Sequence, residues 1–220
     1  MARIGGMADG GASLRERKKA QTRLLIADIA MGLFAARGFD RVTVAEVARA
    51  ADVSVNTVFN YFPTKEDLFF DRQTDVEDML AAIVRERRAG EGAVAALRRR
   101  ILDGFAVGDW TTGLWDGAVE FFRLVESSPS LRARERELGE RTTAALARTL
   151  AAETGAGPDD PLPGIVAGLV TGARHAVLAE ARRRLLDGEP LAAVTDWARE
   201  AYRRAFDVLE RGVPADYGRR

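Results

Sequence analysis

The chain has 220 residues with 33 basic and 33 acidic side chains, no cysteine and one histidine. This composition excludes disulfides and thiolate metal sites, and a single histidine cannot build a histidine-based metal or catalytic cluster. The net charge of zero argues against a nucleic-acid binder, but residues 1–65 carry 10 Lys or Arg against 6 Asp or Glu. This local positive excess, although modest, favours contact with phosphates at the N-terminal end.

The first expected helix follows a glycine-rich lead. Residues 1–14 contain several glycines and little apolar surface, so we expect them to form a disordered N-terminal extension. From about Glu16 to Arg37 apolar residues recur at helical spacing, which predicts a helix with one buried face. Gly38 directly follows and is expected to end that helix.

Two short helices joined by a tight turn are expected next. Thr43 and Glu46 have the spacing of a capping box, in which the hydroxyl and the carboxylate each bind the other residue's backbone amide. Ser54 is a favourable N-cap for a second helix over about Val55–Tyr61. Two such helices form a helix-turn-helix, whose second helix lies in the major groove of DNA.

The second helix leaves an exposed face that is neutral, polar and aromatic, where Glu, Lys and Arg would be usual. Such side chains suit contacts with base edges and phosphates. Two small helices with a turn also occur in many all-helical proteins, so the shape alone leaves DNA binding and ordinary packing as equal alternatives. The face consists of Val55, Asn56, Thr57, Phe59, Asn60 and Tyr61.

A long helix is expected to follow. Thr64 and Asp67 form a weaker capping box, and the helix that they open is predicted to run to about Arg88. Its roughly 25 residues would span about 37 Å. We therefore expect a strut that connects the helix-turn-helix to the rest of the chain.

Beyond Ala89 the pattern is helical throughout, with further helices expected at about 91–105, 113–126, 129–153, 162–186 and 191–211. The predicted fold class is therefore all-α with about nine helices. The expected domains are the extension 1–14, a three-helix helix-turn-helix domain 15–65, and a larger helical ligand-binding and dimerisation domain 66–220.

Gly164, Gly168 and Gly172 are spaced four residues apart along one predicted helix. Each glycine inside a helix costs about 0.5–1 kcal/mol relative to alanine, which suggests that another helix or a ligand approaches the backbone there. A general coding bias toward glycine is the alternative explanation. The longest apolar run, about Ile165–Ala179, is interrupted by a charged residue and is interpreted as too short and too polar to cross a bilayer.

The stretch from about Arg23 to Phe70 resembles the DNA-binding domain of the TetR/AcrR family of bacterial transcriptional repressors. This resemblance covers roughly a fifth of the chain. The matching positions are Ile26, Ala30, Leu33, Phe34, Gly38, Phe39, Asp40, Thr43, Val44, Val47, Ala48, Val53, Ser54, Thr57, Val58, Phe59, Asn60, Tyr61, Phe62, Lys65, Glu66, Asp67 and Leu68.

The resemblance implies a regulator that binds double-stranded operator DNA as a homodimer. Asn56 would pair with adenine, and Val55 and Phe59 would touch thymine methyl groups. Contacts with phosphates would come from Thr43, Ser54, Thr57, Asn60, Tyr61 and Lys65, with the basic run Arg15–Lys19 joining them if it becomes ordered on DNA.

The resemblance also implies a pocket for a small-molecule effector and a dimer formed by the last two helices. Candidates for the pocket are Phe105, Trp110, Trp115, Phe121, Phe122, Arg174 and His175, although ordinary core packing is the commoner role of such aromatic residues. Candidates for the dimer interface are Gly164, Gly168, Gly172, Trp197, Tyr202 and Phe206.

No catalytic motif is present, so neither an enzyme nor a cofactor is expected. The arginine runs 98–100 and 182–184 are interpreted as solvated helix faces. With no signal peptide recognised, a cytoplasmic protein without membrane contact is expected. The alternatives are a helical ligand-binding protein that has lost DNA regulation and an unrecognised enzyme.

Overall fold

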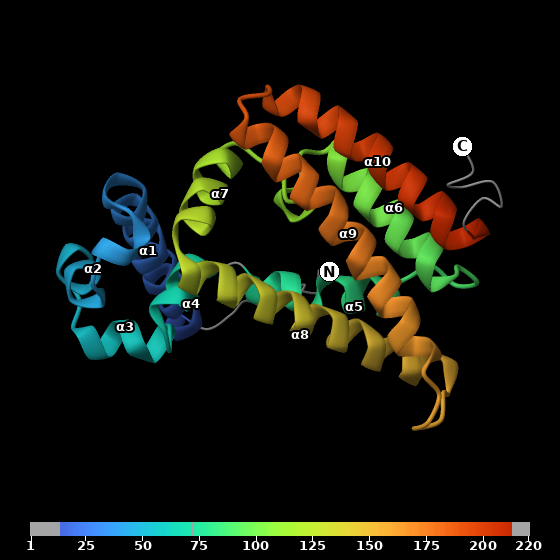
Figure 1. The fold of residues 1–220 in the computed structure, drawn as a ribbon. Helices are drawn as coiled ribbons and strands as arrows, with labels where there is room; N and C mark the ends of the chain where they lie inside the picture. The colour runs from blue at the N-terminus through green and yellow to red at the C-terminus, as the bar shows by residue number, and fades with distance from the viewer. Residues whose placement is uncertain (1–13, 72, 213–220) are drawn as a thin grey trace, which may run out of the picture. The chain divides into compact units, whose positions relative to one another are not determined.

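The computed structural model describes residues 14–71 and 73–212. Within these residues there are ten α-helices, two short 3₁₀ helices and no β-strand, so the predicted all-helical fold class is confirmed (Figure 1). The chain divides into two compact units between Asp71 and Arg72. The predicted extension, residues 1–14, lies outside the described residues except for Leu14, at which α1 begins.

The first unit is built from α1 (Leu14–Arg37), the 3₁₀ helix η1 (Phe39–Arg41), α2 (Val44–Ala50), α3 (Val55–Tyr61) and α4 (Lys65–Phe69). Helix α1 packs against α2 and α4, and α2 packs against α3. Apolar side chains from all of these elements meet in one core, which holds α2 and α3 in place on α1. Its buried members include Ile26, Ala30, Phe34, Phe39, Val42, Val47, Val58, Phe62 and Leu68.

The turn between α2 and α3 is closed by backbone hydrogen bonds. The amide of Val53 donates to the carbonyl of Ala48 at 3.0 Å, and the amide of Asp52 donates to Arg49 at 3.2 Å. These are the two bonds of a Schellman motif, which requires a left-handed residue after the helix. Asp52 takes that conformation with φ +53°, although glycine is the usual residue there. The turn therefore carries some backbone strain.

The predicted continuous helix over 65–88 is wrong, because α4 ends at Phe69 and α5 (Gln73–Arg85) begins as a separate helix. Phe69 and Phe70 are both buried, each with 4% of its surface exposed. Phe70 leaves the helical conformation with ψ +32°. Its neighbour Asp71 accepts a 2.6 Å hydrogen bond from Nε of Arg23 on α1. Packing onto the first unit thus interrupts the expected strut.

The second unit contains α5, α6 (Ala93–Ala106), the 3₁₀ helix η2 (Trp110–Thr112), α7 (Ala118–Ser127), α8 (Pro129–Thr154), α9 (Leu162–Leu186) and α10 (Leu191–Arg211). Helix α8 packs against α5 and α9, while α10 packs against α9 and α6 (Figure 1). A single apolar core runs between these helices, and it includes Leu80, Leu97, Leu146, Val170, Leu185, Tyr202 and Phe206. This core fixes the directions in which side chains of α9 and α10 point.

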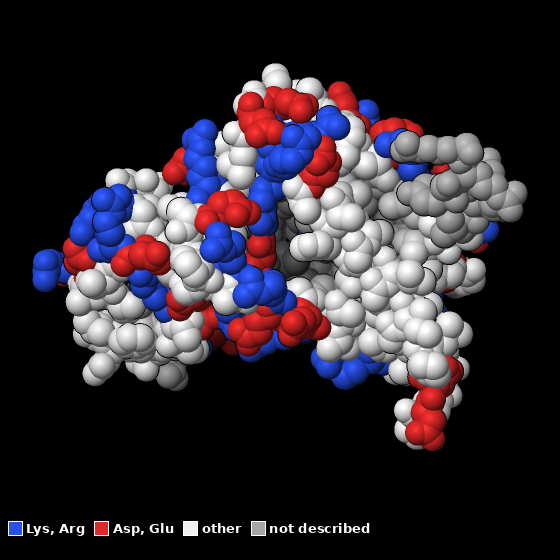
Figure 2. All heavy atoms as spheres, in the orientation of Figure 1, with Lys and Arg blue, Asp and Glu red and all other residues white. Residues whose placement is uncertain are grey.

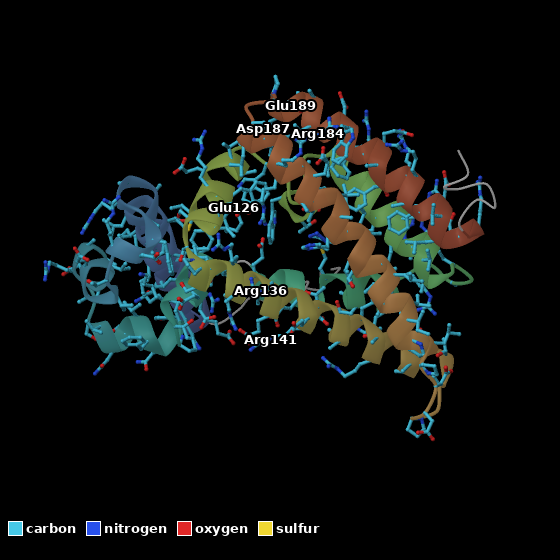
Figure 3. All side chains as sticks on the ribbon, in the orientation of Figure 1. Glu126, Arg136, Arg141, Arg184, Asp187 and Glu189 are labelled. Carbon is cyan, nitrogen blue, oxygen red and sulfur yellow. The ribbon has the colours of Figure 1, made fainter. Side chains whose placement is uncertain are left out.

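The arginine runs of the second unit are engaged in ion pairs inside that unit. Arg98, Arg99 and Arg100 lie within 2.9 Å of carboxylate oxygens of Asp207, Glu91 and Asp109, respectively. At the turn after α9, where Figure 3 shows Arg184, Asp187 and Glu189 together, Arg184 lies 3.5 Å from Glu189 and Arg183 lies 2.6 Å from Asp187. Arg182 pairs with Glu126 and Glu135. Arg98 and Arg182 thus connect different helices of the second unit, whereas the other four arginines pair within or next to their own helix.

Candidate functional site

Helix α3 begins with Ser54 as its N-cap, as predicted from the sequence. The hydroxyl of Ser54 accepts a hydrogen bond from the amide of Thr57 at 3.0 Å, and the two hydroxyls lie 2.8 Å apart. This cap satisfies one of the amides left free at a helix start. Val58 points into the core with no exposed surface, so the opposite side of this two-turn helix faces outward.

The outward face of α3 is uncharged. Val55 and Phe59 expose 38% and 46% of their surface, and Asn56 and Asn60 are exposed beside them. Among the described residues, neither asparagine amide has a hydrogen-bond partner. Thr57 and Tyr61, at the edges, are half-buried. The face thus combines two free amides, which donate and accept, with two apolar side chains.

Helix α2 begins with the complete capping box that its sequence predicts. The amide of Glu46 donates to the hydroxyl of Thr43 at 3.3 Å, and the amide of Thr43 donates to the Glu46 carboxylate at 2.8 Å. The Glu46 pKa is lowered to about 2, first by that backbone hydrogen bond and then by the Thr43 hydroxyl and Arg37. Thr43 is exposed but its hydroxyl already serves this cap.

The cationic residues predicted to contact phosphates lie at the start of α4 and along α1. Lys65 is half-buried and is the first residue of α4. Its ammonium group lies 4.1 Å from the centre of the Phe39 ring, a cation–π contact that orients this side chain. Arg17, Lys18 and Lys19 are exposed on α1. The predicted basic run is therefore helical, although the side chain of Arg15 lies outside the described residues.

The second unit contains a small cavity that its core leaves open. It has a volume of about 10 Å³, roughly the room for one water molecule. Its walls come from α5, α6, η2, α9 and α10. The lining residues are Met79, Ile83, Arg100, Ile101, Gly104, Thr111, Thr112, Arg174 and Tyr202.

Of the seven residues predicted for an effector pocket, Arg174 lines this cavity. Phe105 is buried beside it and packs on the ring of Tyr202 at 5.7 Å between centres. The others are half-buried or buried in separate contacts, except for His175, which is exposed. Trp115, Phe121 and Phe122 pack on one another. Helical periodicity did not single out Thr111 and Thr112, because they lie between two predicted helices, in the short 3₁₀ helix η2.

The chain matches a known family at both ends. Residues 26–71 match the bacterial regulatory proteins of the tetR family, and residues 91–214 match the MftR C-terminal domain. The HTH-type transcriptional regulator TcmR of Streptomyces glaucescens is 33% identical over 159 residues, which cover 68% of this chain and 68% of that protein. The chain belongs to the TetR family.

Two further comparisons agree with this assignment. The HTH-type transcriptional regulator LuxR of Vibrio harveyi is 48% identical over 59 residues, covering 27% of this chain and 25% of that protein. A TetR-family regulator from Streptomyces coelicolor has the same fold, with a TM-score of 0.55, 22% identity, and coverage of 91% of this chain and 99% of that one. This TetR-family protein is a DNA-binding transcriptional regulator and not an enzyme, as predicted.

Helix α9 of this TetR-family protein exposes an apolar face. Leu162, Ile165 and Leu169 expose 59%, 53% and 56% of their surface. The uncharged surface in Figure 2 follows the middle of α9. Gly164, Gly168 and Gly172 are also exposed, and a Cβ atom added to any of them would meet no atom within 4 Å. Packing within the chain therefore does not explain why these positions are glycine.

The prediction that an apolar face of α10 contacts a partner subunit is partly wrong. Tyr202 and Phe206 expose 2% and 3% of their surface because they point into the core of their own unit. Trp197 is half-buried, with the guanidinium group of Arg184 4.4 Å from its ring centre. Three of the five large apolar residues that the described part of the second unit exposes thus lie on α9; the other two are Val107, directly after α6, and Val208 of α10.

The predicted apolar run, about Ile165–Ala179, forms the middle of α9 in the structure. The whole helix has 25 residues, and by length and composition it qualifies as a candidate span, with a mean hydropathy of 1.4 in its most apolar stretch. Only 22% of that stretch is buried within the chain. Such a helix is also typical of a soluble protein in which another subunit covers the apolar face.

Proposed function

We propose that this TetR-family regulator is a cytoplasmic repressor that binds a palindromic operator as a homodimer and is released by a small-molecule effector. The observation that carries the DNA-binding part is the uncharged outward face of α3. Its two free asparagine amides match the donor and acceptor pair of adenine, and its apolar side chains match thymine methyl groups. A surface helix with no function would favour charged residues there.

Homodimerisation is supported by the exposed face of α9. A two-fold dimer brings the same surface patch of both subunits together, so one apolar helix can cover its own copy. The glycines let two backbones approach closely. A dimer also presents two copies of α3, and each head reads one half of a palindrome. The effector would occupy the second unit, whose first helix, α5, directly continues the chain from the DNA-binding unit.

The operator can be found by selecting bound fragments from a random double-stranded DNA library with the full-length protein. We expect the selected sites to contain two inverted half-sites. A set of sites without inverted symmetry would contradict dimeric binding. A chain that selects no DNA sequence would instead support the helical ligand-binding protein without regulatory function.

Two substitutions separate base contacts from phosphate contacts. Asn56→Ala should change the preference among operator variants, with a loss of about 1–3 kcal/mol confined to sites with the matching base. Lys65→Met should weaken binding to all sequences alike and reduce the slope of log affinity against log salt by about one unit. Arg148→Met, at an exposed position of α8, is the matched control and should change neither quantity. If Asn56→Ala lowers all affinities equally, the assignment of its base contact is incorrect.

A further inference from the structure

The cavity of the second unit contains a cation without a carboxylate partner. Arg174 of α9 is half-buried, and its described hydrogen bond runs from Nη2 to the carbonyl oxygen of Thr111 at 3.1 Å. No acidic side chain in the described residues pairs with it. By contrast, Arg100 at the same cavity is neutralised by Asp109 at 2.9 Å. A backbone carbonyl satisfies only part of a guanidinium group, which has five N–H donors.

A second donor points to the same place from another helix. Tyr202 of α10 lines the cavity with 2% of its surface exposed, and its hydroxyl makes no hydrogen bond to any described residue. Burial raises the Tyr202 pKa, an effect that the charge of Arg174 partly offsets. The phenol therefore stays protonated and able to donate. Because this hydroxyl is free and lines the cavity, it can donate to an acceptor that enters there.

The remaining lining gives the cavity two chemically different ends. Thr112 is 6% exposed, but its hydroxyl is already satisfied because it donates to the Asp109 carbonyl at 2.8 Å. Met79 and Ile83 of α5 form an apolar wall. The site thus offers two donors with unused capacity, the Arg174 guanidinium group and the Tyr202 hydroxyl, together with an apolar wall. A group with two acceptor oxygens and an attached apolar part complements such a site.

We infer that the effector is an apolar organic acid, whose carboxylate binds between Arg174 and Tyr202 while its hydrocarbon part lies against Met79 and Ile83. This inference rests on the proposed release by an effector. The cavity of about 10 Å³ has room for about one water molecule in the present conformation, so binding of an organic acid must enlarge it. Met79 has a flexible side chain that can move aside, and its displacement would act on α5.

The test uses the full-length protein and a panel of acids: the straight-chain acids from butanoate to decanoate, benzoate and phenylacetate, each paired with its primary amide. Binding is measured by calorimetry and by tryptophan fluorescence, since Trp110 is adjacent to Thr111 in the chain. We expect at least one acid to bind about tenfold or more tightly than its amide. Charge-assisted hydrogen bonds have this magnitude.

Three variants test the assigned contacts. Tyr202→Phe removes one oxygen and should weaken the acid about tenfold. Arg174→Gln should abolish the preference for the acid over its amide. Arg174→Lys retains the positive charge but lacks the paired N–H donors of the guanidinium group, so it should keep part of that preference. Arg204→Gln, at an exposed position of α10, is the matched control and should leave acid binding unchanged. Thermal unfolding followed by circular dichroism shows whether each variant is folded.

The inference is overturned if no acid in the panel binds more tightly than its amide. It is also overturned if the folded Tyr202→Phe and Arg174 variants bind the preferred acid as the unchanged protein does. Operator binding without any acid is measured in parallel. If the operator is bound but no acid is preferred, the ligand class alone is wrong. If no operator is selected at all, the proposed repressor function fails independently of the ligand.

Discussion

Replacing Gly168 with alanine should have opposite effects on the folded subunit and on the dimer. Within the chain, the added Cβ atom meets no atom within 4 Å, so it creates no clash. Alanine is favoured over glycine inside a helix by about 0.8–1.0 kcal/mol, and the helix itself should gain that amount. In the proposed dimer, the same methyl group would lie where the partner's backbone approaches.

The loss in the dimer can be estimated from overpacking. An extra methyl group in a close-packed contact costs about 1–3 kcal/mol, and two-fold symmetry introduces it twice. The dimer dissociation constant should therefore rise at least about 30-fold, since each 1.4 kcal/mol is about tenfold. The gain in helix propensity is common to the folded monomer and the dimer, so it does not alter this ratio.

Gly139→Ala is the matched control, because Gly139 is also an exposed glycine inside a helix, α8, with no atom within 4 Å of an added Cβ. Sedimentation velocity over a range of protein concentrations gives the dissociation constant of each variant. We expect Gly139→Ala to leave it unchanged. If Gly168→Ala also leaves it unchanged, or strengthens the dimer, no partner backbone approaches α9 at this position and the proposed interface is refuted.

The first unit supplies two stability predictions. Asp52→Gly should raise the free energy of unfolding by about 0.5–1 kcal/mol, because glycine adopts the positive φ of the α2–α3 turn without strain; urea unfolding measures this, and a less stable variant would contradict it. The Glu46 pKa is about 2 in the folded chain against an ordinary value of 4.5, so its stabilising contribution is complete above about pH 4.5 and is lost as the pH falls through 2. Glu46→Gln should reduce this pH dependence, which urea unfolding at successive pH values measures. If the free energies of unfolding of the variant and of the unchanged protein differ by the same amount at every pH, the prediction is refuted.

The cap residues show how far local sequence determines structure here. The boxes Thr43–Glu46 and Thr64–Asp67 both form as predicted, because each involves side chains and amides three residues apart. The bounds of α3, α9 and α10 also agree with the predicted ranges. Proline or glycine next to the apolar pattern marks the ends of the last two helices. Such contacts are nearly independent of the rest of the fold.

The missed break after α4 has a different origin. Nothing local distinguishes Phe69 and Phe70 from two ordinary helical residues. The Phe69 ring packs against Phe34 of α1 and Phe39 of η1, with ring centres 6.2 and 5.9 Å away, and the Phe70 ring packs on Phe69. The helix is interrupted because burying these two rings stabilises the chain more than further helical hydrogen bonds would. The sequence of one segment does not show which distant elements will pack against it, so it does not predict this interruption.

The sequence by itself determined the fold class, the helix-turn-helix and the identity of the outward face of α3, since these follow from periodicity and from caps. Only the tertiary structure decided the direction of Tyr202 and Phe206, which face their own core, and the convergence of Tyr202 with Arg174 on one cavity. Periodicity shows which side of a helix is apolar. Whether that side meets the same chain or a second copy depends on which neighbouring helices cover it, and those neighbours are far away in sequence.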